Sequence, residues 1–196
     1  MSSADKLQCA FTEFDNYNSN DPHLEVHDGK QYPKELLYAL RMSERLNAYQ
    51  PDAAEHIKIA ARCQHIGRWE IPRNSFPMER KGYLQWRSKL ALYHSEISSG
   101  ILERCGFDPA TIEQVKFLLQ KKQLVQHHPD IQVLEDVICL VFIEHYLHDF
   151  ALQHDDDKVV DILKKTIRKM SPRALSEVGK ISMTEKVKIL VQQAVA

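Results

Sequence analysis

The most constraining feature of this sequence is a long segment, residues 131–152, that is apolar on nearly every side of a helix. It contains the stretch VLEDVICLVFIEHYLHDFAL, a pattern typical of a helix buried inside a helical domain. Its longest uninterrupted apolar run, residues 137–143, is far too short to span a bilayer. We therefore expect a central buried helix in a water-soluble fold.

Several other segments repeat apolar residues at three- and four-residue spacing, which predicts amphipathic helices. They cover approximately residues 5–16, 33–46, 53–65, 83–105, 109–119, 159–170 and 184–195, with a short helix after Ser171-Pro172. Residues 21–32 and 69–82 are interpreted as loops and 121–130 as a break, because proline, glycine and polar residues interrupt the pattern. The sequence thus predicts an all-α fold, a single-domain helical bundle over residues 1–196 with extra helices over about 157–196.

Composition and charge limit the classes of partner. Hydrophobic residues make up 43% and charged residues 27% of the chain, as in ordinary globular proteins, and the net charge is −1. No global positive field draws the protein to nucleic acid or to an anionic membrane, so neither is an expected partner. An RNA-associated adaptor rests only on the cations of the 69–82 loop. The oligomeric state does not follow from the sequence.

The N-terminus and the cysteines favour a cytoplasmic location. MSSADKLQCAF lacks the basic and apolar regions of a secretory signal. The four cysteines, Cys9, Cys63, Cys105 and Cys139, show no CxxC pair and no zinc-like spacing. We expect buried free thiols in a reducing compartment.

The stretch AAEHIKIAARCQHIGRWEIPR, residues 53–73, is the first candidate functional segment. Its amphipathic helix ends at a polar pair, Gln64 and His65, followed by Gly67 and Arg68. Arginines and a lysine follow in the next loop, and cations at one helix end can bind a phosphate-bearing ligand. A solvated loop is the equally weighted alternative.

Two carboxylates of the long apolar helix form the second candidate. Glu135 and Asp136 lie in a pattern that predicts burial. Because burying an unpaired carboxylate is expensive, each of these side chains must face solvent, contact a cation or bind a metal.

These segments, in this order, resemble the HD-domain superfamily of metal-dependent phosphohydrolases. Residues 64–68, QHIGR, are similar to the superfamily's His-Asp-Ile-Gly-Lys signature, and HSEI at 94–97 with GIL at 100–102 and CGF at 105–107 is similar to its HPEIGAEIL…LGF segment. The resemblance covers about residues 33–150, which it implies are an HD-like core. The segments QHIGRW, PRNSFP and KGYLQWR resemble those of a divergent branch that is known only as a domain of unknown function.

The resemblance implies a site but also departs from the superfamily pattern. Gln64 stands where a histidine is expected, His65 where an aspartate is expected, and Glu35 where the first histidine is expected. The implied metal ligands are Glu35, His65, His94 and Asp136, a set that suits manganese, iron or zinc. Arg68 and Glu135 are the implied catalytic residues, and the implied substrate-binding residues are Gln64, Arg68, Lys81 and Arg87.

Two functions follow as expectations. The first is a metal-dependent phosphohydrolase that acts on a nucleotide or another small phosphoester, in which metal-bound water attacks phosphorus and Glu35 or Glu135 assists as a base. The second is a non-catalytic HD-like module that binds a nucleotide or a protein partner. In such a non-catalytic module the four implied ligand side chains would form hydrogen bonds with one another, without a metal.

Overall fold

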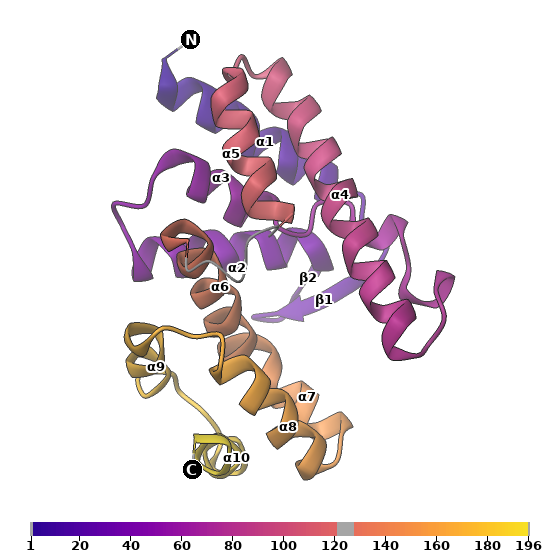
Figure 1. The fold of residues 1–196 in the computed structure, drawn as a ribbon, viewed down its shortest axis with the longest axis vertical. Helices are drawn as coiled ribbons and strands as arrows, with labels where there is room; N and C mark the ends of the chain where they lie inside the picture. The colour runs from indigo at the N-terminus through magenta and orange to yellow at the C-terminus, as the bar shows by residue number, and fades with distance from the viewer. Residues whose placement is uncertain (1, 121–127, 196) are drawn as a thin grey trace. The chain divides into compact units, whose positions relative to one another are not determined.

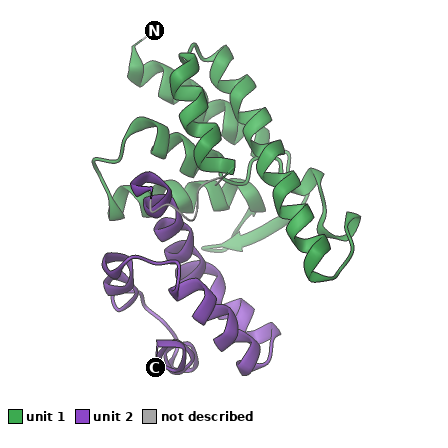
Figure 2. Cartoon of the chain, viewed as in Figure 1, with its two compact units in different colours: residues 1–126 green, residues 127–196 purple. Residues whose placement is uncertain are grey.

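The structure is a computed structural model that describes residues 2–120 and 128–195, and within these ranges it is mostly helical. The described residues form ten α-helices and one two-stranded hairpin, which confirms the predicted all-α class (Figure 1). The chain divides into two compact units, residues 1–126 and 127–196 (Figure 2). Seven residues of the predicted break, 121–127, lie outside the described residues.

Unit 1 consists of helices whose apolar stripes pack together, with a hairpin between the first two. The elements are α1 (Ser3–Asn18), β1 (Leu24–His27), β2 (Lys30–Pro33), α2 (Lys34–Tyr49), α3 (Glu55–Cys63), α4 (Arg80–Arg104) and α5 (Pro109–Gln120). The loop between α3 and α4 contains two short 3-10 turns, Arg68–Glu70 and Arg73–Ser75. α5 packs against both α4 and α3, and α4 lies beside it in Figure 1.

The hairpin corrects the prediction of a loop over residues 21–32. β1 and β2 pair antiparallel, with Leu24 opposite Pro33 and His27 opposite Lys30. Asp28 and Gly29 both have positive φ, 50° and 73°, as a two-residue type I′ turn requires. The Asp-Gly pair and the apolar–polar alternation of residues 24–27 were the available signals, although the apolar residues Leu24 and Val26 are exposed.

The cysteine prediction is half right. Cys63 and Cys139 are buried free thiols as expected, whereas Cys9 of α1 and Cys105, next to the end of α4, form a disulfide. Their Cα atoms are 5.8 Å apart, within the usual range for a disulfide. Since the two cysteines are 96 positions apart in sequence, their pairing depends on how α1 packs in unit 1.

Unit 2 contains the long apolar segment and the C-terminal helices. Its elements are α6 (Pro129–Val141), a π-helical turn (Phe142–Tyr146), α7 (Leu147–Gln153), α8 (Asp156–Ile167), α9 (Pro172–Val178) and α10 (Glu185–Val195). The predicted helix over 131–152 is therefore helical throughout, but its middle adopts the wider π geometry. Leu134, Val137, Leu140 and Leu147 have no exposed surface, as the apolar pattern predicted.

The boundary between the two units falls inside the predicted HD-like core of about 33–150, and the single-domain assignment stays a prediction. None of the helices in the described residues combines the length and apolar character that a bilayer span requires.

Candidate functional site

The turn after α3 is fixed by a buried asparagine from another helix. Gly67 adopts a left-handed conformation, φ 66°, and its backbone N–H donates to Asn18 Oδ1 at 3.2 Å. Asn18 Nδ2 in turn donates to the carbonyl oxygen of Glu35 at 3.5 Å. Asn18, at the end of α1, has no exposed surface, so it joins the turn to the start of α2 inside the protein.

Glu35, His65 and Arg68 form a connected polar chain. Glu35 Oε2 lies 3.2 Å from His65 Nδ1, and Glu35 Oε1 lies 3.7 Å from Arg68 Nε. On the other side of the imidazole, Arg68 Nη1 lies 3.2 Å from His65 Nε2. The guanidinium also stacks on Trp86, with its Cζ 4.7 Å from the ring centroid. Arg68 therefore contacts a carboxylate, an imidazole and an indole at once.

The two histidine rings are positioned by different neighbours. Tyr38 of α2 stacks on His65, with ring centroids 4.0 Å apart and an interplanar angle of 13°. His94 of α4 donates from Nδ1 to the carbonyl oxygen of Ile66 at 2.6 Å. The centroids of His65 and His94 are 6.1 Å apart. The resemblance thus identified two histidines that do come together in the fold.

Burial shifts the acid–base properties of two of these groups. It raises the pKa of Glu35 to about 7, against the opposing effect of the Arg68 charge. Burial, together with the smaller effect of the neighbouring His65, lowers the pKa of His94 to about 3. Such shifted values are common at functional sites.

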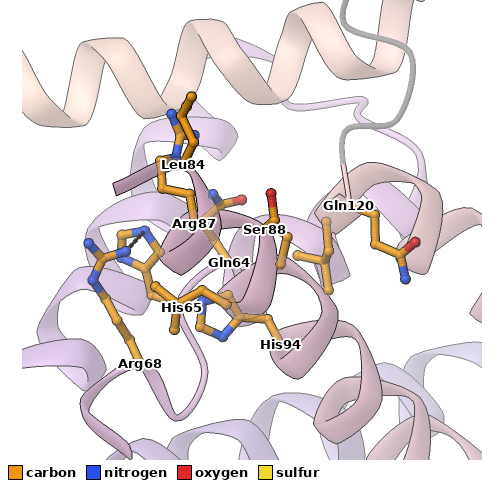
Figure 3. A pocket seen from close by; sticks show the side chains of 11 residues that line it. Gln64, His65, Arg68, Leu84, Arg87, Ser88, His94 and Gln120 are labelled. Atoms are coloured by element: carbon orange, nitrogen blue, oxygen red, sulfur yellow. Dashed lines mark hydrogen bonds between the residues drawn. The ribbon is translucent and has the colours of Figure 1, made fainter. Parts of the chain in front are cut away.

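A cavity of about 240 Å³ lies next to the side chains of His65 and Arg68 (Figure 3). Five of the predicted site residues line it: Gln64, His65, Arg68, Arg87 and His94. The remaining lining residues are Leu84, Ser88, Leu90, Ala91, Leu119 and Gln120, so α4, α5 and the turn after α3 contribute. Gln64 is 9% exposed, and its Oε1 has no hydrogen-bond partner in the described residues.

The other predicted residues are Lys81 of unit 1 and two carboxylates of unit 2. Lys81 is exposed in the first turn of α4 and does not line the cavity. Glu135 and Asp136 are buried in α6 of unit 2. Asp136 accepts hydrogen bonds from Gln132 Nε2 at 2.9 Å, Ser171 N at 2.8 Å and Ser171 Oγ at 2.6 Å. Within unit 2 its carboxylate therefore joins α6 to Ser171, the N-cap of α9.

We expect Asp136→Asn to destabilise the protein by about 1–3 kcal/mol, because the amide group cannot accept all of these hydrogen bonds. Urea unfolding measures the change. Asp161→Asn is the matched control, since Asp161 forms only a surface ion pair with Lys165, which contributes little. Equal effects of the two changes would contradict this structural role.

The residues of unit 1 do not fit the implied metal. In the described parts of the chain, no three His, Cys, Asp or Glu side chains gather as a metal-binding group. The Arg68 guanidinium, which is always protonated, already contacts His65 Nε2 and Glu35 Oε1, and a metal at these atoms would be repelled by it. The full ligand set includes Asp136 of unit 2, and its assembly stays a prediction.

Sequence reasoning missed Asn18, Tyr38 and Trp86. Trp86 donates from Nε1 to the carbonyl oxygen of Ile71 at 2.8 Å, which positions the ring under Arg68. Tyr38 and Trp86 appear in the sequence as ordinary helix residues, and Asn18 lies just past the predicted helix of residues 5–16. Only the fold brings them to the turn after α3.

Comparison with known proteins now places the chain. Residues 8–191 match the model of a domain of unknown function, DUF4202. The chain belongs to this family. The match agrees with the predicted branch of unknown function, while the HD superfamily stays a resemblance. No curated protein and no solved structure matches the chain.

Proposed function

We propose that unit 1 of this DUF4202 protein binds a small phosphorylated molecule, a nucleotide or another phosphoester, in the cavity lined by Arg68 and Arg87. The observation that supports this most directly is the pair of guanidinium groups at one cavity whose lining contains no aspartate or glutamate among the described residues. Guanidinium groups bind phosphate oxygens through paired, charge-assisted hydrogen bonds.

The size of the cavity favours a small ligand. Sites for drug-sized ligands span about 300–1,000 Å³, and this one measures about 240 Å³. A phosphoryl group that carries a small organic substituent fits such a volume. The Ser88 hydroxyl and the Gln64 amide add neutral hydrogen-bonding groups, and the buried Gln64 Oε1 is ready to accept a ligand hydroxyl.

Both expected functions, hydrolysis and binding without turnover, use this cavity. Because the unit 1 residues do not fit a metal, the geometry favours the binding module over metal-dependent hydrolysis. Elemental analysis of the purified protein and a phosphoester panel with added manganese separate the two. Bound metal with turnover that is lost in His65→Ala supports the metal-dependent hydrolase.

Binding of pyrophosphate, measured by isothermal titration calorimetry, tests the proposal itself. Charge-assisted hydrogen bonds contribute about 1.5–3 kcal/mol each, so we expect Arg87→Gln to weaken binding by roughly tenfold or more. Arg87 is exposed on α4, and its replacement leaves the core intact.

Arg80→Gln is the matched control. Arg80 is also exposed and lies in the same helix, but it does not line the cavity. Its replacement by glutamine removes the same charge as Arg87→Gln. We expect this variant to bind pyrophosphate as the unmodified protein does. Undetectable binding by the unmodified protein, or an equal loss in both variants, overturns the proposal.

A further inference from the structure

We infer that His65 is a phosphoryl acceptor, whose Nε2 attacks the phosphorus of the bound molecule and forms a phosphohistidine without a metal. The inference rests on the proposed binding of a phosphorylated molecule and adds the reaction at that site. It uses the Glu35–His65–Arg68 chain, which simple binding leaves unexplained.

The hydrogen-bond partners assign the protons of the His65 ring. A guanidinium N–H can only donate, so His65 Nε2 accepts from Arg68 Nη1 at 3.2 Å and has a lone pair there. In the neutral ring the proton is then on Nδ1, which donates to Glu35 Oε2 at 3.2 Å. Nε2 is thus the nucleophilic nitrogen. A nucleophile with a base that is itself positioned is the arrangement typical of covalent catalysis.

The ring is also held in one orientation. Tyr38 stacks on it with an interplanar angle of 13°, and the Glu35 side chain that contacts it is only 10% exposed. The Glu35 backbone is fixed as well, because its N–H donates to Asp21 Oδ2 at 3.0 Å. Preorganisation of this kind lowers the cost of reaching the attacking geometry.

Arg68 brings the phosphorus to the same nitrogen. Its guanidinium contacts His65 Nε2 directly, so a phosphoryl group bound by Arg68 lies next to that nitrogen once its oxygens replace Nε2 as the acceptor. Arg87, which lines the same cavity, adds a second positive charge (Figure 3). Two guanidinium groups neutralise the charge that spreads over the phosphoryl oxygens during transfer.

The chemical step balances with water as the only co-reactant. The Nε2 lone pair forms the N–P bond, while the P–O bond to the leaving group breaks and its electron pair stays on the departing oxygen, which takes a proton from water. Glu35 stabilises the positive charge on the ring. Water then attacks phosphorus, the N–P electron pair returns to Nε2, inorganic phosphate departs, and the proton from water passes to solvent.

The experiment uses the full chain in EDTA with two phosphoryl donors, p-nitrophenyl phosphate and acetyl phosphate. Samples are quenched in alkali, in which phosphohistidine survives, and analysed by intact and peptide mass spectrometry. We expect one phosphoryl group per chain, located on His65 and lost in acid, with a burst of one p-nitrophenolate.

Variants separate this inference from the proposed function. His65→Gln should abolish the adduct because it removes the attacking nitrogen, and pyrophosphate binding by the unmodified protein tests the proposed binding site separately. His148→Gln is the control, because His148 is exposed on α7 of unit 2 and is not among the cavity-lining residues; this variant should be phosphorylated normally. Pyrophosphate binding with no adduct from either donor, an adduct on another residue, or turnover only with added manganese overturns the inference. If His65→Gln does not fold, peptide mapping of the unmodified protein still shows whether the phosphoryl group is on His65.

Discussion

Replacing Gly67 by alanine will destabilise the protein by about 2–4 kcal/mol, of which the left-handed backbone accounts for roughly 1–2 kcal/mol. The rest comes from crowding. A Cβ at this position would lie 3.0 Å from Ile97 Cδ1, 3.1 Å from Tyr17 Cε1 and 3.2 Å from Tyr93 Cε1. These neighbours are themselves fixed, because both tyrosine hydroxyls donate to Glu70. Thermal or urea unfolding measures the loss.

Two other glycines divide this effect into its parts. Gly29 also has positive φ, but nothing lies within 4 Å of its Cβ position, so Gly29→Ala reports backbone strain alone. Gly100 lies inside the C-terminal part of α4, and a Cβ there would lie near only Arg104 Nη1, at 3.6 Å. Gly100→Ala should therefore stabilise the protein by about 0.5–1 kcal/mol. A Gly67→Ala loss no larger than that of Gly29→Ala would show that the neighbours yield at little cost.

Helix positions were predictable because burial imposes a period on the sequence. The stripe around Trp86, Leu90 and Ile101 predicted α4, and the structure buries all three residues. Pro33 correctly indicated where α2 begins. Features that depend on contacts between distant segments left no such period: the disulfide joins Cys9 to Cys105, and Asn18 shows no sign in the sequence that it bonds to Gly67.

The candidate site was predictable to the extent that its residues follow one another in a signature. Gln64, His65 and Arg68 came from one pentapeptide, and His94 from a second segment with the same resemblance, and all four line one cavity. The contact between the Arg68 guanidinium and His65 Nε2 was not predictable, because it depends on the turn at Gly67. The metal that the resemblance implies next to His65 stays a prediction.

The stability of the protein should depend on pH through two buried groups, Glu35 and His94. For Glu35, burial raises the pKa from 4.5 to about 7. The folded state thus binds this proton more tightly than the unfolded state, so the stabilisation is complete below pH 4.5 and is lost as pH rises to about 7. For His94, burial lowers the pKa from 6.5 to about 3. The unfolded state then gains the proton first, and stability falls as pH falls below 6.5.

Between pH 4.5 and 6.5 the two effects oppose each other and nearly cancel. Glu35→Gln removes the Glu35 effect and leaves that of His94. This variant should therefore lose about 1.4 kcal/mol of stability for each unit by which the pH falls through that range. Between pH 8 and pH 4.5, the stability of the unmodified protein relative to the variant should rise by roughly 3 kcal/mol. Urea unfolding of both proteins at pH 8, 6.5, 5.5 and 4.5 measures this difference.

Glu103→Gln provides the comparison for these curves. Glu103 is an exposed carboxylate on α4, outside the cavity, so its replacement shows whether the pH dependence belongs to Glu35 rather than to the loss of any carboxylate of unit 1. A constant difference between Glu35→Gln and the unmodified protein across the range would mean that the Glu35 carboxyl takes up its proton equally well when folded and unfolded. Burial of Glu35 beside His65 and Arg68 would then have no effect on its titration, contrary to the desolvation that its 7% exposure implies.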